Sequence, residues 1–454
     1  MASPALNALY RADNLDVLRK SITDASVDLA YLDPPFKTNK HYAARFKRQP
    51  GQWPDGPVAA YADTWRWNDE AAAAFEDTLA HGPHEVRRTL SAFRDMLGPG
   101  DMLAYLAMIA VRLVELKRVL RPAGSVYLHC DQSASHPLKL LMDSVFGPAN
   151  FQNEIVWAYR TGGVGKRRWA RKHDVLLFYS RTPRFTFNPQ RERVYYEKPF
   201  FSSAREDAGR HYADVYMRDV WDIPAVINVA SERLGYPTQK PEALLSRIVQ
   251  ASGSEGGVVL DPFCGCGTTL VVAERLGRRW IGIDSAYLAT ALTKQRLREH
   301  CGLVPGRDYA LHGEPRTVEE ALRLQAADPR QFRHFVLGLL GARPVEARSA
   351  AGDGFHGRML WAMEGEPAKP QPALVAIADG KEPAKQLKEL ARVLRREGVS
   401  VGVLVSVAPL LAAAEELRAA QGKAGGKRQV HLQVLTLADL LAAQHGVQLA
   451  GASG

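Results

Sequence analysis

The sequence predicts an α/β fold built on a Rossmann-like, mostly parallel sheet, and two observations predict it. Short apolar runs at residues 27–32, 125–130 and 257–260 have the length and composition of strands that are buried on both faces. Segments with apolar positions at helical spacing alternate with these runs, including residues 103–120 and 268–276. Such alternation is typical of a parallel sheet covered by helices.

The same patterns predict the other elements. We expect helices at residues 138–146 and 241–251, a strand at 280–283, some helix at 70–79, and, near the C-terminus, strands at 373–377 and 399–405 with helices at 382–397 and 409–420.

Changes in composition divide the chain into four segments. Residues 1–150 and 233–328 carry the strand–helix alternation and are expected to form two halves of one domain. The first half contains an irregular insertion at residues 37–100. Residues 151–232 lose the alternation and become basic and aromatic, and residues 329–454 form a separate small α/β domain.

Composition limits the class of protein. The 454 residues carry a formal net charge of +10 and a pI of about 9.4, which favours an anionic partner, although a general arginine bias would have the same effect. Four cysteines are too few for a disulfide framework, and Cys264 and Cys266 have no matching cluster for zinc. We find neither a signal peptide nor an apolar run long enough for a bilayer, so we expect a cytoplasmic protein with no membrane partner.

A glycine-bearing loop follows the apolar run that ends at residue 260. Gly265 and Gly267 allow the backbone to approach a ligand closely, but Leu270 stands where a dinucleotide fingerprint needs a third glycine. No phosphate-binding lysine follows, which excludes a P-loop and favours a cofactor without phosphates. Asp284 ends the next strand, where a carboxylate can bind ribose hydroxyls. The alternative is a plain turn with a capping aspartate.

A second loop, Asp33-Pro34-Pro35-Phe36, follows the apolar run at residues 27–32. The two prolines forbid helix and stiffen the loop. The Asp33 carboxylate and the Pro34 carbonyl are acceptors suited to an exocyclic amine, and Phe36 offers a face on which a base can stack. No Pro-Cys dipeptide occurs, so the covalent route of C5-cytosine methylation is not expected. The alternative is an ordinary turn.

These two loops make the chain resemble the amino-methyltransferase family of site-specific DNA methylases over roughly residues 5–300. The Asp33 loop precedes the glycine-bearing loop in the chain, a circularly permuted order that resembles the β class. Further blocks that look like family motifs are Ser125-Val126-Tyr127-Leu128-His129-Cys130-Asp131 and Gly235-Tyr236-Pro237-Thr238-Gln239-Lys240-Pro241. The resemblance implies a fold of the S-adenosylmethionine (SAM)-dependent methyltransferase type.

The resemblance also implies roles for individual residues. The catalytic loop is Asp33, Pro34, Pro35 and Phe36. The residues implied to bind SAM are Asp13, Asn14, Thr238, Lys240, Asp261, Pro262, Phe263, Gly265, Gly267, Thr268 and Asp284. Among these, Asp13 and Asn14 are expected near the adenine, Thr238 and Lys240 near the methionine end, and Asp284 at the ribose. A surface position is the alternative for Lys240. His129 and Asp131 are either site residues or helix caps.

The resemblance makes residues 151–232 the target recognition region, with double-stranded DNA as the partner. The candidate DNA-binding residues are Arg160, Lys166, Arg167, Arg168, Arg171 and Lys172, with a solvated basic loop as the alternative. A cognate restriction endonuclease and a homodimer are further partners that the resemblance leaves open.

The predicted reaction is methyl transfer from SAM to the exocyclic amine of a flipped base. Asp33 at the first motif position favours N6-adenine, and N4-cytosine is the alternative. Related loops also act on RNA or protein glutamine, but the large basic segment favours duplex DNA. A catalytically silent DNA-binding protein with a relic methylase fold is the more distant alternative.

Residues 329–454 resemble the Mrr-like, restriction-endonuclease-type domain that follows some methylases, in degenerate form. His356 stands where an aspartate is expected, and Ala376 and Ala378 stand where glutamine and lysine are expected. Phosphodiester cleavage needs carboxylates that hold a metal ion, so we predict a nuclease-inactive domain. Asp353 is the one candidate for a shifted metal site.

Overall fold

The computed structural model describes residues 7–37, 40–46, 57–62, 64–159, 165–167, 169–198, 205–227, 230–345, 354–363, 366–378, 383–407 and 430–444. The chain divides into two units, which are described separately. The first comprises residues 1–41, 62–232 and 239–284, and the second comprises residues 42–61, 233–238 and 285–454.

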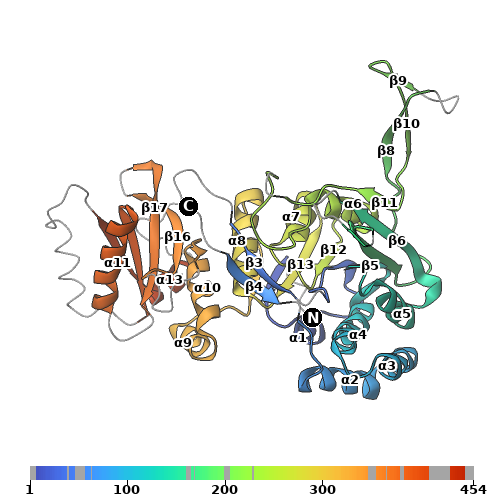
Figure 1. The fold of residues 1–454 in the computed structure, drawn as a ribbon, viewed down its shortest axis with the longest axis horizontal. Coiled ribbons are helices and arrows are strands. Elements are labelled where there is room, and N and C mark those ends of the chain that lie inside the picture. The colour runs from blue at the N-terminus through green and yellow to red at the C-terminus, as the bar shows by residue number, and fades with distance from the viewer. Residues whose placement is uncertain are drawn as a thin grey trace. The chain divides into compact units, whose positions relative to one another are not determined.

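A mostly parallel sheet forms the centre of the first unit (Figure 1). Its strands run in the order β11 (Val220–Asp222), β6 (Phe151–Ala158), β7 (His173–Ser180), β5 (Leu120–Cys130), β2 (Val27–Leu32), β12 (Val258–Asp261), β13 (Arg279–Asp284) and β1 (Ala8–Arg11). Only β7 is antiparallel to its two neighbours, β5 and β6. The predicted Rossmann-like class of sheet is therefore confirmed.

Residues 151–232 were expected to lie outside the strand–helix alternation, yet they supply β6, β7 and β11 to this sheet. They also form a separate three-stranded sheet of β8 (Arg191–Tyr196), β10 (Arg210–Tyr216) and β9 (Arg205–Asp207), which we call the β-arm (Figure 1). The reason is that β7 carries an apolar run, Val175 to Tyr179, that is buried in the core.

Helices of the first unit cover the sheet. They are α1 (Asn14–Ser21), α2 (Asp69–His81), α3 (His84–Leu97), α4 (Asp101–Val119), α5 (Ser135–Phe146), η1 (Pro148–Asn150), α6 (Glu242–Ser252) and α7 (Thr268–Arg275). The predicted helices at 103–120, 138–146, 241–251 and 268–276 correspond to α4, α5, α6 and α7. The insertion at residues 37–100 is more helical than expected, because Val86, Leu90 and Phe93 give α3 a buried apolar face.

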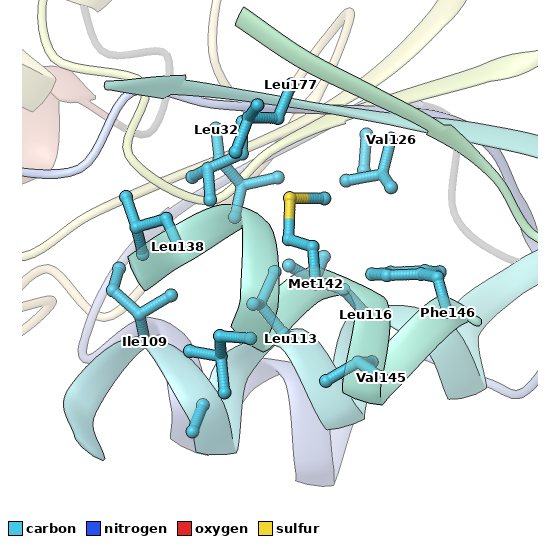
Figure 2. Packing of buried hydrophobic residues seen from close by; sticks show 14 of the residues in the cluster. Leu32, Ile109, Leu113, Leu116, Val126, Leu138, Met142, Val145, Phe146 and Leu177 are labelled. Atoms are coloured by element: carbon cyan, nitrogen blue, oxygen red, sulfur yellow. The ribbon is translucent and has the colours of Figure 1, made fainter. Parts of the chain in front are cut away.

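Apolar side chains from α4 and α5 pack under the sheet strands (Figure 2). Leu113 and Leu116 come from α4 and Met142 from α5, and all three are fully buried. They meet Leu32 and Val126 from β2 and β5 in one cluster. Burial of this face fixes β2, whose end carries the Asp33 loop described below, and its neighbour β5.

The second unit contains a five-stranded sheet, β15 (Arg343–Pro344), β16 (Gly357–Met363), β17 (Glu366–Ala378), β18 (Val401–Ser406) and β19 (His431–Thr436). Its other elements are β3 (His41–Ala44), β4 (Val58–Ala62), α8 (Tyr287–Cys301), β14 (Ala310–His312), α9 (Val318–Ala327), α10 (Pro329–Leu339), α11 (Pro383–Glu397) and α13 (Leu437–Gln444). Strands β17, β18 and β19 are parallel, β16 pairs antiparallel with β17, and β15 pairs antiparallel with β16.

The predicted C-terminal elements at 373–377, 382–397 and 399–405 correspond to β17, α11 and β18. The predicted helix at 409–420 lies outside the described residues. Within the described part of the chain, no helix combines the length and the apolar composition needed to cross a membrane.

Two adjacent leucines on α5 test this packing. Leu141 is fully buried, whereas the side chain of Leu140 is 55% exposed. We expect Leu141→Ala to lower the free energy of unfolding by about 2–5 kcal/mol through lost burial and a cavity, as is usual for buried leucine. Leu140→Ala should change it by less than about 0.5 kcal/mol. Urea denaturation measures both, and equal effects would contradict the packing.

Candidate functional site

The two predicted loops lie at the same edge of the sheet. Strands β2 and β12 are parallel neighbours, with Leu29 opposite Val259 and Ala30 opposite Leu260. Asp33 directly follows β2, and Asp261 ends β12. Because adjacent parallel strands end at one edge, loops that are more than 200 residues apart in sequence meet where α/β sheets bind ligands.

The backbone of the glycine-bearing loop after β12 requires glycine at two positions. Gly265 and Gly267 have φ angles of 51° and 77°, in the left-handed region that side chains with a Cβ rarely adopt. The Gly265 N–H donates to Oδ2 of Asp284 at 3.0 Å, which joins the loop to the end of β13. Both glycines therefore leave the loop without Cβ atoms that a ligand would meet.

Asp261 is a buried carboxyl group at the base of this loop. It accepts hydrogen bonds from Thr269 Oγ1 at 2.5 Å and from the Phe263 N–H at 3.0 Å. Burial raises its pKa to about 7, although both hydrogen bonds act in the opposite direction. Asp261 thus fixes the loop from within, and its carboxyl group keeps its proton to a higher pH than an ordinary aspartate does.

Asp13 and Asn14 lie where α1 begins, next to the same loop. Asp13 Oδ1 accepts from the Leu15 and Asp16 N–H groups and caps the helix. Asn14 Nδ2 donates to the Pro262 carbonyl at 2.7 Å. The structure thus brings Asn14 to the predicted cofactor loop, while Asp13 also acts as a helix cap.

Lys240 joins the catalytic loop to the cofactor loop. Its Nζ lies 2.5 Å from Oδ2 of Asp33, and the two side chains are only 8% and 16% exposed. Its carbonyl accepts from Oγ1 of Thr268, at the start of α7, at 3.4 Å. Lys240 is therefore not the surface residue that was the alternative, and its ammonium group pairs with the catalytic aspartate.

The two oxygens of Asp33 differ in their surroundings. Oδ2 is held by Lys240, whereas Oδ1 is buried and has no hydrogen-bond partner among the described residues. A buried acceptor without a partner costs free energy, so it is a position where a donor from a ligand is favoured. This oxygen is the best-placed acceptor for an amine hydrogen.

Phe36 lies beside Lys240 and His129. The Lys240 Nζ is 5.2 Å from the Phe36 ring centroid, and the His129 ring centroid is 5.6 Å from it. His129 is thus next to the site, whereas Asp131 accepts from Ser133 N–H and Oγ in the turn before α5. His129 is therefore the neighbour of the site, whereas Asp131 stabilises the turn and does not cap α5, whose N-cap position is Ala134.

The remaining residues singled out in the sequence make other contacts, are exposed, or lie outside the described residues. Thr238 belongs to the second unit, where its Oγ1 is 2.6 Å from the Tyr61 hydroxyl. Lys166, Arg167, Arg171 and Lys172 are exposed, and Arg160 and Arg168 lie outside the described residues. Cys264 and Cys266 are buried within the cofactor loop. Among the described residues, no group of three or more histidine, cysteine or acidic side chains could hold a metal ion.

Sequence reasoning missed Asp174 on β7, whose Oδ2 lies 3.2 Å from His129 Nε2. The available signal was a charged residue at the start of the otherwise apolar strand β7. A buried carboxylate needs a partner, so such a residue predicts a polar contact inside the fold.

Comparison with known proteins identifies the class. The family described as DNA methylase (N6/N4 methyltransferases) matches residues 27–293, more than half of the chain, and the chain belongs to this family. Its members are SAM-dependent amino-methyltransferases, and the residues here fit that cofactor. Two glycines open the loop, a carboxylate ends each of two neighbouring strands, and the loop contains no lysine for phosphates.

Individual relatives agree with this class. The type II methyltransferase M.HpaI of Haemophilus parainfluenzae is 35% identical over 187 residues, which are 41% of this chain and 57% of that protein. The DNA adenine methyltransferase YhdJ of Escherichia coli K12 is 32% identical over 301 residues, 64% of this chain and 83% of that protein. The chain therefore spans little more than half of M.HpaI.

Two solved structures are similar at low sequence identity. The cytosine-N4-specific PvuII DNA methyltransferase is 15% identical with a TM-score of 0.40, covering 64% of this chain and 86% of that chain. The SAM complex of M1.HpyAVI is 16% identical with a TM-score of 0.35, covering 64% and 98%.

The raised pKa of Asp261 predicts a pH-dependent stability. A carboxyl group whose folded pKa is near 7 stabilises the fold below its unfolded pKa of about 4, and this contribution is lost as the pH rises toward about 7. We therefore expect wild type to lose stability relative to Asp261→Asn over this interval. Urea denaturation of both proteins at a series of pH values measures the difference, and a constant difference would contradict the assignment.

Proposed function

We propose that this protein transfers the methyl group of SAM to an exocyclic amine of a base in double-stranded DNA, with N6 of adenine as the favoured target and N4 of cytosine as the alternative. The supporting observation is the arrangement of Asp33, with one oxygen held by Lys240 and the other buried without a partner in the described part of the chain. Aspartate rather than serine at this position favours adenine. The base is proposed to leave the helix, because its amine cannot reach a buried carboxylate from within the stack.

The chemistry depends on orientation of the amine. The amine is a weak nucleophile because its lone pair is delocalised into the ring. Asp33 Oδ1 and the Pro34 carbonyl are proposed to accept its two hydrogens, which returns electron density to nitrogen, while Phe36 stacks against the base. SAM supplies an electrophilic methyl group when bound. Because the acceptors are fixed in place before the base arrives, little reorganisation is needed.

The β-arm supports duplex DNA as the substrate. Its register places Arg191, Arg193, Arg205 and Arg210 on one face, whereas Glu192 and Glu206 lie on the other face. Asp207 and Asp214 share the arginine face and both pair with Arg193, so this face, called basic here, carries four arginines against two carboxylates. On the basic face Arg191, Arg193 and Arg210 each lie over a tyrosine ring, at 4.6, 3.9 and 4.3 Å. Arginines braced in this way are suited to phosphate contacts. We therefore assign the β-arm to the target recognition region together with the basic residues between 160 and 172.

The C-terminal domain is proposed to be inactive as a nuclease. His356 Nδ1 accepts a hydrogen bond from the Ile377 N–H at 2.9 Å, so its imidazole braces β17. Ala376 and Ala378, at the other two expected positions, are buried. These side chains offer no carboxylate for a metal ion. Asp353 lies outside the described residues. A partner endonuclease and a homodimer remain predictions of the family resemblance.

A change at Asp33 tests the proposed reaction. We expect Asp33→Asn to lower the single-turnover rate of methyl transfer by about 100-fold or more, the usual cost of losing a fixed charged acceptor. Mass spectrometry of nucleosides from treated DNA measures the rate and identifies the base, which we predict to be N6-methyladenine.

Asp28→Asn is the matched control. Asp28 is also on β2, its side chain is 14% exposed, and it forms an ion pair with Arg121 at 2.9 Å. Its loss should lower stability but change the rate by less than about twofold, since Asp28 is remote from the loop end of the strand. Equal loss of rate in both variants, or methylation of another atom, would contradict the proposal.

The β-arm proposal predicts a salt-dependent effect. Removing two phosphate contacts with Arg191→Ala/Arg210→Ala should weaken duplex binding for all sequences and reduce the slope of log K against log salt by about two. Arg88→Ala/Arg323→Ala removes the same charge from exposed positions on α3 and α9. Fluorescence anisotropy at several salt concentrations compares them. An unchanged slope in the β-arm variant would refute the assignment.

A further inference from the structure

His129 lies in a buried polar chain beneath the catalytic loop. Its side chain has no solvent exposure, and both ring nitrogens have partners. Nδ1 is 2.9 Å from the Tyr31 hydroxyl on β2, and Nε2 is 3.2 Å from Asp174 Oδ2 on β7. The Tyr159 hydroxyl donates to the other oxygen of Asp174 at 3.0 Å. These hydrogen bonds thus join three neighbouring strands, β2, β5 and β7.

The charges of these groups fix the orientation of the imidazole. Burial alone would raise the pKa of Asp174, but the hydrogen bond and charge of His129, with contributions from Lys240 and the Tyr159 hydroxyl, hold that pKa below its usual value. An ionised carboxylate only accepts, so Nε2 must donate to it. Burial raises the pKa of Tyr31 well above its usual range, so its hydroxyl keeps its proton. The ring is therefore held at both nitrogens.

This ring contacts the residue that we expect to stack on the base. The Phe36 ring is tilted by 40° against His129 at 5.6 Å. Trp157 approaches His129 edge-on at 5.5 Å, with an interplanar angle of 85°. Phe36 is half-buried and follows two prolines, whose rings fix the φ angles of the loop before it, and the plane of its ring depends on rotation of its own side chain.

We propose that His129 is a positioning residue, which fixes the plane of the Phe36 ring and thereby the plane of the base stacked on it. His129 does not touch the substrate; it acts through Phe36. The effect matters because the amine must meet Asp33 Oδ1 and the methyl group at the same time, and a misplacement of about 1 Å can cost 100-fold in rate. This inference rests on the proposed stacking role of Phe36.

A double-mutant cycle tests the inference. The duplex is one that wild type methylates, chosen by modification-sensitive sequencing, and the readouts are the single-turnover rate and the Kd for SAM. His129→Gln should lower the rate by about tenfold while changing the Kd for SAM by less than about twofold. In a Phe36→Ala background the same change should have little further effect, because residues that act through one another are not additive.

Two tyrosines give a matched pair of variants that test the same hydrogen-bonded groups with a smaller change, the loss of one hydroxyl. Tyr31→Phe removes the hydroxyl that holds His129, and we expect it to slow methyl transfer in the same way as His129→Gln. Tyr127→Phe is the control, because Tyr127 is also buried and loses one hydroxyl contact, to Ser252 Oγ at 2.7 Å. Its rate should match wild type.

The outcomes separate the two proposals. If Phe36→Ala leaves the rate unchanged, the stacking role of Phe36 is wrong, and the inference that depends on it is also overturned. If Phe36→Ala slows the reaction but His129→Gln is additive with it, or has no effect, the positioning role alone is overturned. Equal losses in Tyr31→Phe and Tyr127→Phe would show a general effect of buried hydroxyls and would also overturn it.

Discussion

The buried ion pair between Lys240 and Asp33 is the contact on which the site depends. It joins the end of β2 to the segment before α6, and the Lys240 carbonyl extends the connection to Thr268 at the start of α7. Ion pairs with so little exposure contribute little net stability, because both charges lose their hydration. Here the ion pair instead fixes the orientation of the Asp33 carboxylate. The pair occupies one carboxylate oxygen and leaves the other, Oδ1, with no partner among the residues that the structure describes.

The rest of the site is arranged around that oxygen. The parallel pairing of β2 and β12 brings the cofactor loop to the catalytic loop, and the buried Asp261 fixes the cofactor loop from within. Two prolines stiffen the loop that follows Asp33, and a polar chain of Tyr31 and His129 lies below Phe36. Asp261, Tyr31 and His129 are buried and hydrogen-bonded, so this part of the site is formed before any ligand arrives.

Part of this arrangement could be predicted from the sequence. Buried parallel strands are visible as short apolar runs, and their carboxyl ends share an edge, so the meeting of Asp33 with Asp261 follows from pattern alone. Gly265 and Gly267 were predicted to let the backbone approach a ligand closely; their left-handed φ angles are a finding of the structure. Helix α3 has apolar positions at helical spacing, and the tryptophan- and glycine-rich residues before it obscured this pattern.

Side-chain partners could not be predicted in the same way. The pairing of Lys240 with Asp33 was not predicted, because the direction of a long side chain depends on the tertiary structure around it; its place near the cofactor stays a prediction. Thr238, two residues earlier, belongs to the second unit and contacts Tyr61. Asp174 carries no motif, and its pairing with His129 depends on β7 being inserted antiparallel beside β5. Such contacts follow from register, which a single sequence leaves open.

The central claim is that Asp33 Oδ1 receives the amine of the target base. A crystal structure with sinefungin and a duplex carrying the methylated site tests it most directly. The account predicts an extruded base with its exocyclic nitrogen about 3 Å from Oδ1, while Lys240 stays on Oδ2. A base still stacked in the duplex, or an amine bound elsewhere with Oδ1 unpaired, would contradict it.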